Sequence, residues 1–255
     1  MMGVATSVDA LRAPGRRSQN AASDTFRLVV TGASGQLGSA LVAAAHESGA
    51  TVAALDRQPL PGGVRADGVL RIGGVDLEVE DDARAGMDLA ALRLGGIDAL
   101  VHAAGAFAFE TLEGGALDTW DRLYAANLRT AVVAARAALP HLRHRGNGAR
   151  LVFVGAASAA RAVRGMGAYA ASKAGVARLA ESLADELRDA GITVNAVLPS
   201  VLDTPANRAA MPEADPRRWV TTRQLADVVL FLLSPQSQAV TGASIPVVGR
   251  CAGPA

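Results

Sequence analysis

The sequence predicts an α/β domain in which a doubly wound, parallel sheet of about seven strands carries helices on both faces. From Phe26 onward, short apolar runs alternate with longer segments of helical period. The short runs show no polar alternation, which is typical of strands buried on both faces of a sheet. Strands that alternate with helices in this way form βαβ units with right-handed crossovers. Because no repeat or linker divides the 255 residues, we expect a single domain over residues 26–250.

The elements follow in order along the chain. Residues 1–25 are polar and lack hydrophobic periodicity, so we expect a disordered N-terminal tail. The expected strands are 26–30 (FRLVV), 51–56 (TVAALD), 97–105 (IDALVHAAG), 149–157 (ARLVFVGAA), 192–199 (ITVNAVLP) and 243–249 (ASIPVVG). The expected helices are 37–49, 118–142, 169–191 and 221–234.

The composition excludes several classes of protein. The 25 basic residues are balanced by 24 acidic ones, so the chain has no basic surface of the kind that binds nucleic acid. No apolar run is long enough to span a membrane, and the N-terminal stretch lacks the apolar centre of a secretory signal. A single cysteine, Cys251, and histidines without zinc-site spacing predict no bound metal. We therefore expect a cytoplasmic protein that acts on a small molecule, without a nucleic-acid or membrane partner.

A glycine-rich turn joins the first expected strand to the first expected helix. In VVTGASGQLG, the glycines are Gly32, Gly35 and Gly38. A helix that begins there exposes backbone N–H groups and the positive end of its dipole, which suits a pyrophosphate. Gly32 would allow the sharp turn, Gly35 the close approach of phosphate, and Gly38 the packing of helix on strand. The pattern predicts a dinucleotide site in a Rossmann-type sheet.

An acidic residue, Asp56, ends the second expected strand. There its carboxylate can accept hydrogen bonds from the adenosine ribose and would repel a 2′-phosphate, which favours NAD(H) over NADP(H). The neighbouring Arg57 acts in the opposite sense, so NADP(H) stays open. The structural alternative for Asp56 is a cap at the end of the strand.

Tyr169 and Lys173 stand at i and i+4 in AYAASKAGV, on one face of an expected helix. A tyrosine has a pKa near 10 in water, and a nearby cation lowers that pKa toward the working pH. Lys173 is the only lysine among the 25 basic residues, and its compact ammonium suits this task better than the broad guanidinium of arginine. We predict that Tyr169 carries the proton of the reaction and that Lys173 lowers its pKa; the alternative is an ordinary exposed pair.

Taken together, the motifs resemble those of the short-chain dehydrogenase/reductase family from Phe26 to Gly249. They are TGASGQLG, HAAG, the NL at Asn127, YAASK, NAVLP and VTGASIPVVG, in the family's order. The resemblance implies that Tyr169 donates or accepts the proton, that Lys173 also holds the nicotinamide ribose, and that Asn127 kinks its helix and holds a water linked to Lys173. It implies adenine contact by Leu77 or Val79. The implied cofactor-binding residues are Gly32, Ser34, Gly35, Gln36, Leu37, Gly38, Asp56, Arg57, Leu77, Ala103, Ala104, Gly105, Asn127, Tyr169, Lys173, Pro199 and Thr204.

Two positions depart from the family. His102 stands where many members have asparagine, and either a hydrogen-bonding or a packed imidazole fits there. Ala156 occupies the position of the usual catalytic serine, while Ser158 lies slightly further along. Without that serine, a site stabilises the oxyanion of a carbonyl substrate less well.

One subgroup, the dihydropteridine reductases, resembles the chain in having this alanine, the same glycine spacing, and a segment like LDTPANRAAMPEADPRRW. The resemblance implies NADH-dependent hydride transfer to a conjugated imine, quinonoid or carbonyl substrate. Two alternatives stay open. One is a ketone or alcohol oxidoreductase that uses Ser158. The other is a non-redox or nucleotide-sensing protein that kept the fold.

Residues near 200–220 are expected to form a lid over the substrate, stiffened by three prolines. Five residues are candidates for contact with the substrate: Ala156, Ser158, Phe107, Met211 and Trp219. The alternative for the lid is a surface excursion packed by Trp219. Members of the family pair through two long helices, here 118–142 and 168–190, so the resemblance implies a homodimer or homotetramer.

Overall fold

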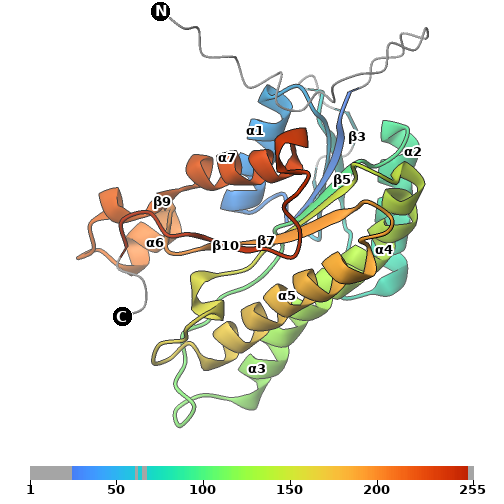
Figure 1. Ribbon diagram of the computed structural model, residues 1–255. Coiled ribbons are helices and arrows are strands. Elements are labelled where there is room, and N and C mark those ends of the chain that lie inside the picture. Colours follow the sequence, from blue (N-terminus) through green and yellow to red (C-terminus); the bar gives the residue numbers. More distant parts are fainter. Residues whose placement is uncertain (1–24, 61–62, 65–67, 252–255) are drawn as a thin grey trace, which may run out of the picture.

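A computed structural model describes residues 25–60, 63–64 and 68–251. These residues form one large sheet between two layers of helices (Figure 1). The stretch predicted as a tail lies outside the described residues, apart from Thr25.

The sheet has eight strands in the order β10-β7-β6-β5-β1-β2-β4-β3. The strands are β1 (Arg27–Thr31), β2 (Thr51–Asp56), β3 (Gly63–Val64), β4 (Leu70–Gly73), β5 (Ala99–His102), β6 (Arg150–Val154), β7 (Thr193–Pro199) and β10 (Ser244–Val247). The described pairings are parallel, except that the two-residue β3 pairs antiparallel with β4. This arrangement confirms the predicted doubly wound parallel sheet. A small second sheet pairs β8 (Leu202–Asp203) with β9 (Val220–Thr221).

The helices are α1 (Gln36–Glu47), α2 (Glu80–Leu94), α3 (Leu117–Leu123), α4 (Thr130–Arg145), α5 (Gly167–Glu186), α6 (Pro205–Ala210) and α7 (Thr222–Leu233). The single helix expected over 118–142 is wrong as a continuous helix, because a π-helical segment, η2 (Tyr124–Arg129), separates α3 from α4. Asn127 lies within η2, so the irregularity falls where a kink was expected. The sequence did not predict α2, α6, β3 or β4.

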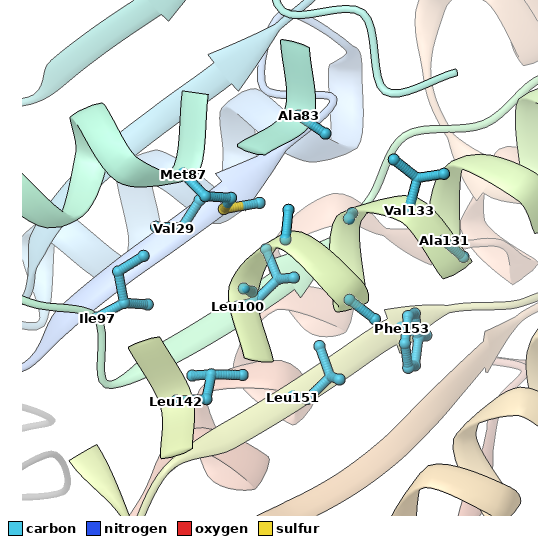
Figure 2. Packing of buried hydrophobic residues seen from close by; sticks show 14 of the residues in the cluster. Val29, Ala83, Met87, Ile97, Leu100, Ala131, Val133, Leu142, Leu151 and Phe153 are labelled. Carbon is cyan, nitrogen blue, oxygen red and sulfur yellow. The ribbon is translucent and has the colours of Figure 1, made fainter. Parts of the chain in front are cut away.

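Each face of the sheet has its own hydrophobic core. Helices α1 and α7 pack against each other on one face, and α2, α4 and α5 cover the other (Figure 1). On the second face, Met87 of α2 and Leu142 of α4 pack with Leu100 of β5 and Leu151 of β6 (Figure 2). All four of these side chains are at most 1% exposed. Within the described ranges, none of the helices has the length and apolar content that a membrane span needs.

The direction of winding reverses between β1 and β5. From β1 the chain continues through β2 to one edge, and from β5 through β6 and β7 to the other. Thr31 and His102, the last residues of β1 and β5, are register partners. A doubly wound sheet opens a crevice at the carboxyl ends of such a strand pair, and ligands bind there. The fold therefore places the predicted site at this crevice.

Candidate active site

The glycine turn packs tightly against the loop that follows β5. Gly32 has φ +68°, and a Cβ atom there would lie 2.6 Å from both the Cα and the N atom of Ala104. A Cβ on Gly38 would lie 2.0 Å from the carbonyl oxygen of Gly32. Only glycine fits at these two positions, because any side chain would push α1 or the second loop away from the turn.

The N-terminus of α1 suits an anionic group of a dinucleotide. Gly35 is its N-cap, no side chain caps the helix, and the first turn contains no acidic residue. Ser34, Gly35 and Gln36 are exposed. Backbone N–H groups at a helix start, next to a glycine turn, are a common binding site for a pyrophosphate, so the residues present fit the predicted cofactor.

Asp56 ends β2 beside this turn. Its carboxylate accepts one hydrogen bond from the backbone N–H of Ser34 at 2.9 Å and another from that of Gln58, also at 2.9 Å. The residue thus caps the strand end and tethers the turn. The Arg57 side chain is 66% exposed, and its guanidinium lies 3.9 Å from the carboxylate of Glu78. A carboxylate is therefore fixed at the crevice, while the arginine extends into solvent.

Tyr169 and Lys173 project from α5 toward the crevice end of the sheet. Lys173 is buried, and its Nζ donates to the carbonyl oxygen of Val154 at 2.9 Å. Burial lowers the pKa of Lys173 to about 8. Burial also raises the pKa of Tyr169 to about 12. In the protein by itself the pKa of Tyr169 thus moves in the direction opposite to the predicted one, and burial of the phenol is the cause.

Asn127 connects the π-helical segment to both sides of the site. Its Oδ1 accepts from the N–H of Ala106 at 2.8 Å, and its Nδ2 donates to the carbonyl of Ala106 at 3.0 Å and to Ser172 Oγ at 2.9 Å. Ser172 in turn donates to the carbonyl of Tyr169 at 2.8 Å. A Cβ on Gly105 would lie 2.6 Å from Asn127 Oδ1 and 3.1 Å from Lys173 Nζ. Three segments therefore meet at one point: η2, α5 and the loop that follows β5.

His102 is buried in a short hydrogen-bond chain. Its Nδ1 lies 2.9 Å from Thr31 Oγ1 and its Nε2 lies 3.3 Å from Thr130 Oγ1. The Thr130 hydroxyl donates to the carbonyl of Ala126, so it accepts from His102, which places the proton on Nε2. Burial first, and then the charge of Lys173, lower the pKa of His102 to about 3. The neutral imidazole thus joins β1 to the start of α4 through hydrogen bonds on both ring nitrogens, as the hydrogen-bonding alternative for His102 expects.

Comparisons with known proteins agree with this geometry. The sequence profile of a family described as "Enoyl-(Acyl carrier protein) reductase" matches residues 32–249. The 2-(R)-hydroxypropyl-CoM dehydrogenase of Xanthobacter autotrophicus is 33% identical over 246 residues, which cover 87% of this chain and 96% of that protein. The chain belongs to the short-chain dehydrogenase/reductase family.

Solved structures of this family share the fold. A short-chain dehydrogenase/reductase from Serratia marcescens is 30% identical, with a TM-score of 0.76 over 87% of this chain and 96% of its own. The aldohexose dehydrogenase of Thermoplasma acidophilum is 26% identical, with a TM-score of 0.78 over 88% and 93% of the two chains. The protein is thus an oxidoreductase of the short-chain dehydrogenase class, whose members generally use NAD(H) or NADP(H).

The sequence predicts Ala156 in the place of the usual serine of a short-chain dehydrogenase. Ala156 is buried in extended backbone, two residues after the end of β6. Ser158 lies in the short 3-10 turn Ala157–Ala159, and its Oγ is buried without a hydrogen-bond partner among the described residues. An unpartnered buried hydroxyl is costly, so a group that binds beside it would relieve that cost.

The remaining predicted cofactor residues lie at different depths around the crevice. Leu37 is half-buried in the first turn of α1, Ala103 and Ala104 are half-buried in the loop after β5, and Pro199 is buried at the end of β7. Leu77 is buried in the core against α2, whereas its alternative, Val79, is the half-exposed N-cap of α2. Among the described residues, no group of three or more histidine, cysteine or acidic side chains could hold a metal.

The predicted lid contains β8, α6 and β9. Thr204 is buried and caps α6 by accepting from the N–H of Asn207. Trp219 is 7% exposed, so its indole is a packing group in this structure, whereas Met211 is half-buried. Arg208 donates two hydrogen bonds to Asp203 and is thereby held at the base of the segment.

Sequence reasoning missed three residues of the site. The backbone of Ala106 pairs with the Asn127 side chain. The Ser172 hydroxyl is hydrogen-bonded to Asn127, and the Thr130 hydroxyl to His102. The position of Ser172, directly before Lys173, was an available signal. Nothing in the sequence marks the other two, because the chain folds back to meet them.

Proposed function

We propose that the protein is an NAD(H)-dependent oxidoreductase that reduces a conjugated imine, quinonoid or carbonyl compound, with Tyr169 as its proton donor. The observation that carries this proposal is that Lys173 and Asn127 meet beside Gly105, in the loop after β5, while the Tyr169 ring lies against Phe107 of the same loop. A bound nicotinamide cofactor would supply the hydride. The residues of this chain would hold it, orient the substrate and move the accompanying proton.

The roles of the residues follow from their positions. The Tyr169 phenol delivers the proton to the reduced substrate, and Lys173 is the one buried cation within the described part of α5 that can stabilise the phenolate left behind. The Lys173 ammonium now donates a hydrogen bond to the Val154 carbonyl. If it donated to a ribose hydroxyl instead, it would hold the cofactor. The Asn127 side chain is already hydrogen-bonded to Ala106 and Ser172. We therefore assign the water that would link Asn127 to Lys173 to the backbone carbonyl of Asn127.

The preference for NAD(H) follows from Asp56. Its carboxylate is fixed by two backbone N–H groups beside the turn, where a 2′-phosphate would meet its charge. Arg57, which could balance that phosphate, extends into solvent, with its guanidinium 3.9 Å from the carboxylate of Glu78. The ratio of kcat/KM for NADH and NADPH tests this preference directly.

Ala156 supports a conjugated substrate. When hydride enters a conjugated ring, the negative charge spreads over several atoms, so the hydroxyl that a ketone needs matters less. The resemblance to dihydropteridine reductases points the same way. Steady-state reduction of quinonoid dihydropterin with NADH tests it. We expect turnover that Tyr169→Phe abolishes, and turnover equal in the two proteins would rule out an enzymatic pterin reduction at this site.

A second candidate function is the oxidation of a secondary alcohol, or its reverse, with Ser158 as a displaced serine. The unpartnered Ser158 Oγ favours it. So does the name of the Xanthobacter relative, a dehydrogenase of a hydroxypropyl compound. Loss of ketone reduction in Ser158→Ala, with NADH binding unchanged, would support this candidate; an unchanged rate would exclude Ser158 from the chemistry. Tight NADH binding without turnover of any substrate in a broad panel would instead indicate a nucleotide sensor.

We also propose that the protein forms a homodimer or homotetramer through α3, α4 and α5. Large apolar side chains of α3 and η2, among them Leu117, Trp120 and Tyr124, are exposed on the single chain. A monomer rarely leaves such groups together in water. Light scattering after size-exclusion chromatography measures the mass. A monomer at micromolar concentration would contradict the proposal.

A further inference from the structure

The segment from Ala106 to Glu110 passes over the site and is fixed at both ends. At its start, both the N–H and the carbonyl of Ala106 are hydrogen-bonded to the Asn127 amide. At its end, the N–H of Glu110 donates to the carbonyl of Gly165 at 2.8 Å. A loop held at two points so close in sequence has little freedom to swing away.

An aromatic contact reinforces the second anchor. Gly165 has φ +78°, and a Cβ there would lie 2.4 Å from Cζ of Phe109. The Phe109 ring therefore lies directly on the backbone of Gly165, whose positive φ also favours glycine. Phe109 and the Glu110 hydrogen bond together join this segment to the loop that leads into α5.

Between the two anchors, Phe107 stands against Tyr169. The ring centroids are 4.9 Å apart and the ring planes meet at 81°, an edge-to-face contact. Such pairs attract each other beyond their simple burial of area. Phe107 is nevertheless 56% exposed, so the ring leaves a large apolar surface open next to the catalytic phenol.

We propose that Phe107 is a specificity-determining residue: a fixed aromatic wall that shields Tyr169 from water and selects substrates with a flat apolar group beside the reacting carbon. The choice of substrate rests on the proposed function, whereas the shielding of Tyr169 does not. A flat ring can stack against the solvent-exposed surface of Phe107, whereas a small aliphatic group would leave most of that surface exposed to water.

The shielding can be measured without any substrate, because the chain has only two tyrosines. Tyr124 is 55% exposed, and Tyr124→Phe leaves Tyr169 as the single phenol. In that background, ¹³C NMR of labelled Tyr169 Cζ follows its ionisation. The parent should stay protonated at about pH 11, since burial raises the pKa of Tyr169 to about 12. Phe107→Ala should be substantially ionised there.

Controls separate shielding from a general loss of structure. Phe231→Ala removes an exposed phenylalanine of α7, 47% exposed and on the other face of the sheet, and should leave the titration unchanged. Phe109→Ala should lower the pKa of Tyr169 by less than Phe107→Ala does, because the loss of the Phe109 ring loosens the second anchor. Circular dichroism at each pH confirms that the variants are folded. A Phe107→Ala titration that matches the parent would overturn the proposal.

The selectivity is measured first by binding and then by rate. NMR titration of the NADH-mixed protein with acetophenone and with 2-butanone should show that Phe107→Ala weakens acetophenone binding about tenfold, a typical effect of losing an aromatic contact, and leaves 2-butanone within about threefold. Phe107→Tyr should restore the preference. Equal losses for both ketones would overturn the selectivity. The rates are measured with NADH and the diketones 1-phenyl-1,2-propanedione and 2,3-butanedione. If the parent reduces neither diketone, the proposed carbonyl reduction is wrong. The ketone-binding experiment and the pH titration of Tyr169 still decide the role of Phe107.

Discussion

Lys173 Nζ donates to the carbonyl oxygen of Val154, at 2.9 Å, where β6 ends beneath α5. The only lysine of the chain is therefore buried and bonded to backbone, and no carboxylate of the described residues forms a hydrogen bond or ion pair with it. An ammonium in this setting has lost much of its hydration. It is held in place for the site, at a cost to the stability of the fold that can be measured.

We expect that cost to appear in the pH dependence of stability. An amine whose pKa is lower in the folded protein is neutral when folded and charged when unfolded between the two values. The free energy of unfolding should therefore rise as pH increases from about 8 to the ordinary 10.5. The rise relative to Lys173→Met should be on the order of 3 kcal/mol. Urea unfolding at several pH values measures it, and parallel curves for the two proteins would contradict it.

The glycine turn offers a matched pair of substitutions. Gly32 and Gly74 both have positive φ, +68° and +76°, but a Cβ at Gly74 would meet nothing within 4 Å. Gly74→Ala should cost only the conformational strain, about 1 kcal/mol. Gly32→Ala should cost at least about 2 kcal/mol more and weaken NADH binding, because its Cβ collides with the backbone of Ala104. Similar unfolding free energies for the two variants would show that the turn can relax.

Asp56 should determine the choice of cofactor. We expect Asp56→Asn to raise the NADPH-to-NADH ratio of kcat/KM by about tenfold or more, since the charge that repels a 2′-phosphate is removed while the amide oxygen can still accept a hydrogen bond. Glu78→Gln, which removes a more distant carboxylate near Arg57, serves as the control and should change the ratio less. An unchanged ratio in Asp56→Asn would assign the carboxylate to capping alone.

Ser172 should act by positioning Asn127. Its Oγ accepts from the Asn127 side chain and donates to the Tyr169 backbone carbonyl, so it joins η2 to α5. We expect Ser172→Ala to lower kcat about tenfold with little change in KM for NADH, and Ser172→Thr to restore part of the loss. Ser182→Ala, on the same helix but exposed, should be silent. A loss confined to KM for NADH would contradict a role in positioning.

Much of the fold follows from local patterns in the sequence. The buried strands, the glycine turn and the Tyr169–Lys173 spacing depend on neighbours in the chain, and the predicted sheet is confirmed. The short β4 (Leu70–Gly73) and the polar helix α2 escaped prediction because they have weak periodicity. The π-helical segment was expected only as a kink at Asn127.

The site could be predicted by residue type more readily than by contact. The pairing of Asn127 with Ala106 and the contact of Phe107 with Tyr169 join segments distant in sequence, and only the folded chain brings them together. The pKa of Tyr169 depends on its burial, which spacing on a helix does not reveal. The direction of that shift is therefore opposite to the one that the Tyr169–Lys173 spacing predicts.

The central claim is that the Tyr169 phenol carries the proton of the reaction. The most direct test compares Tyr169→Phe with the control Tyr124→Phe in single-turnover reduction of quinonoid dihydropterin, or of 1-phenyl-1,2-propanedione, by bound NADH. We expect Tyr169→Phe to slow the reaction by about 10² to 10⁴, with the Kd for NADH nearly unchanged and Tyr124→Phe close to the parent. A Tyr169→Phe rate within a few-fold of the parent would contradict the account.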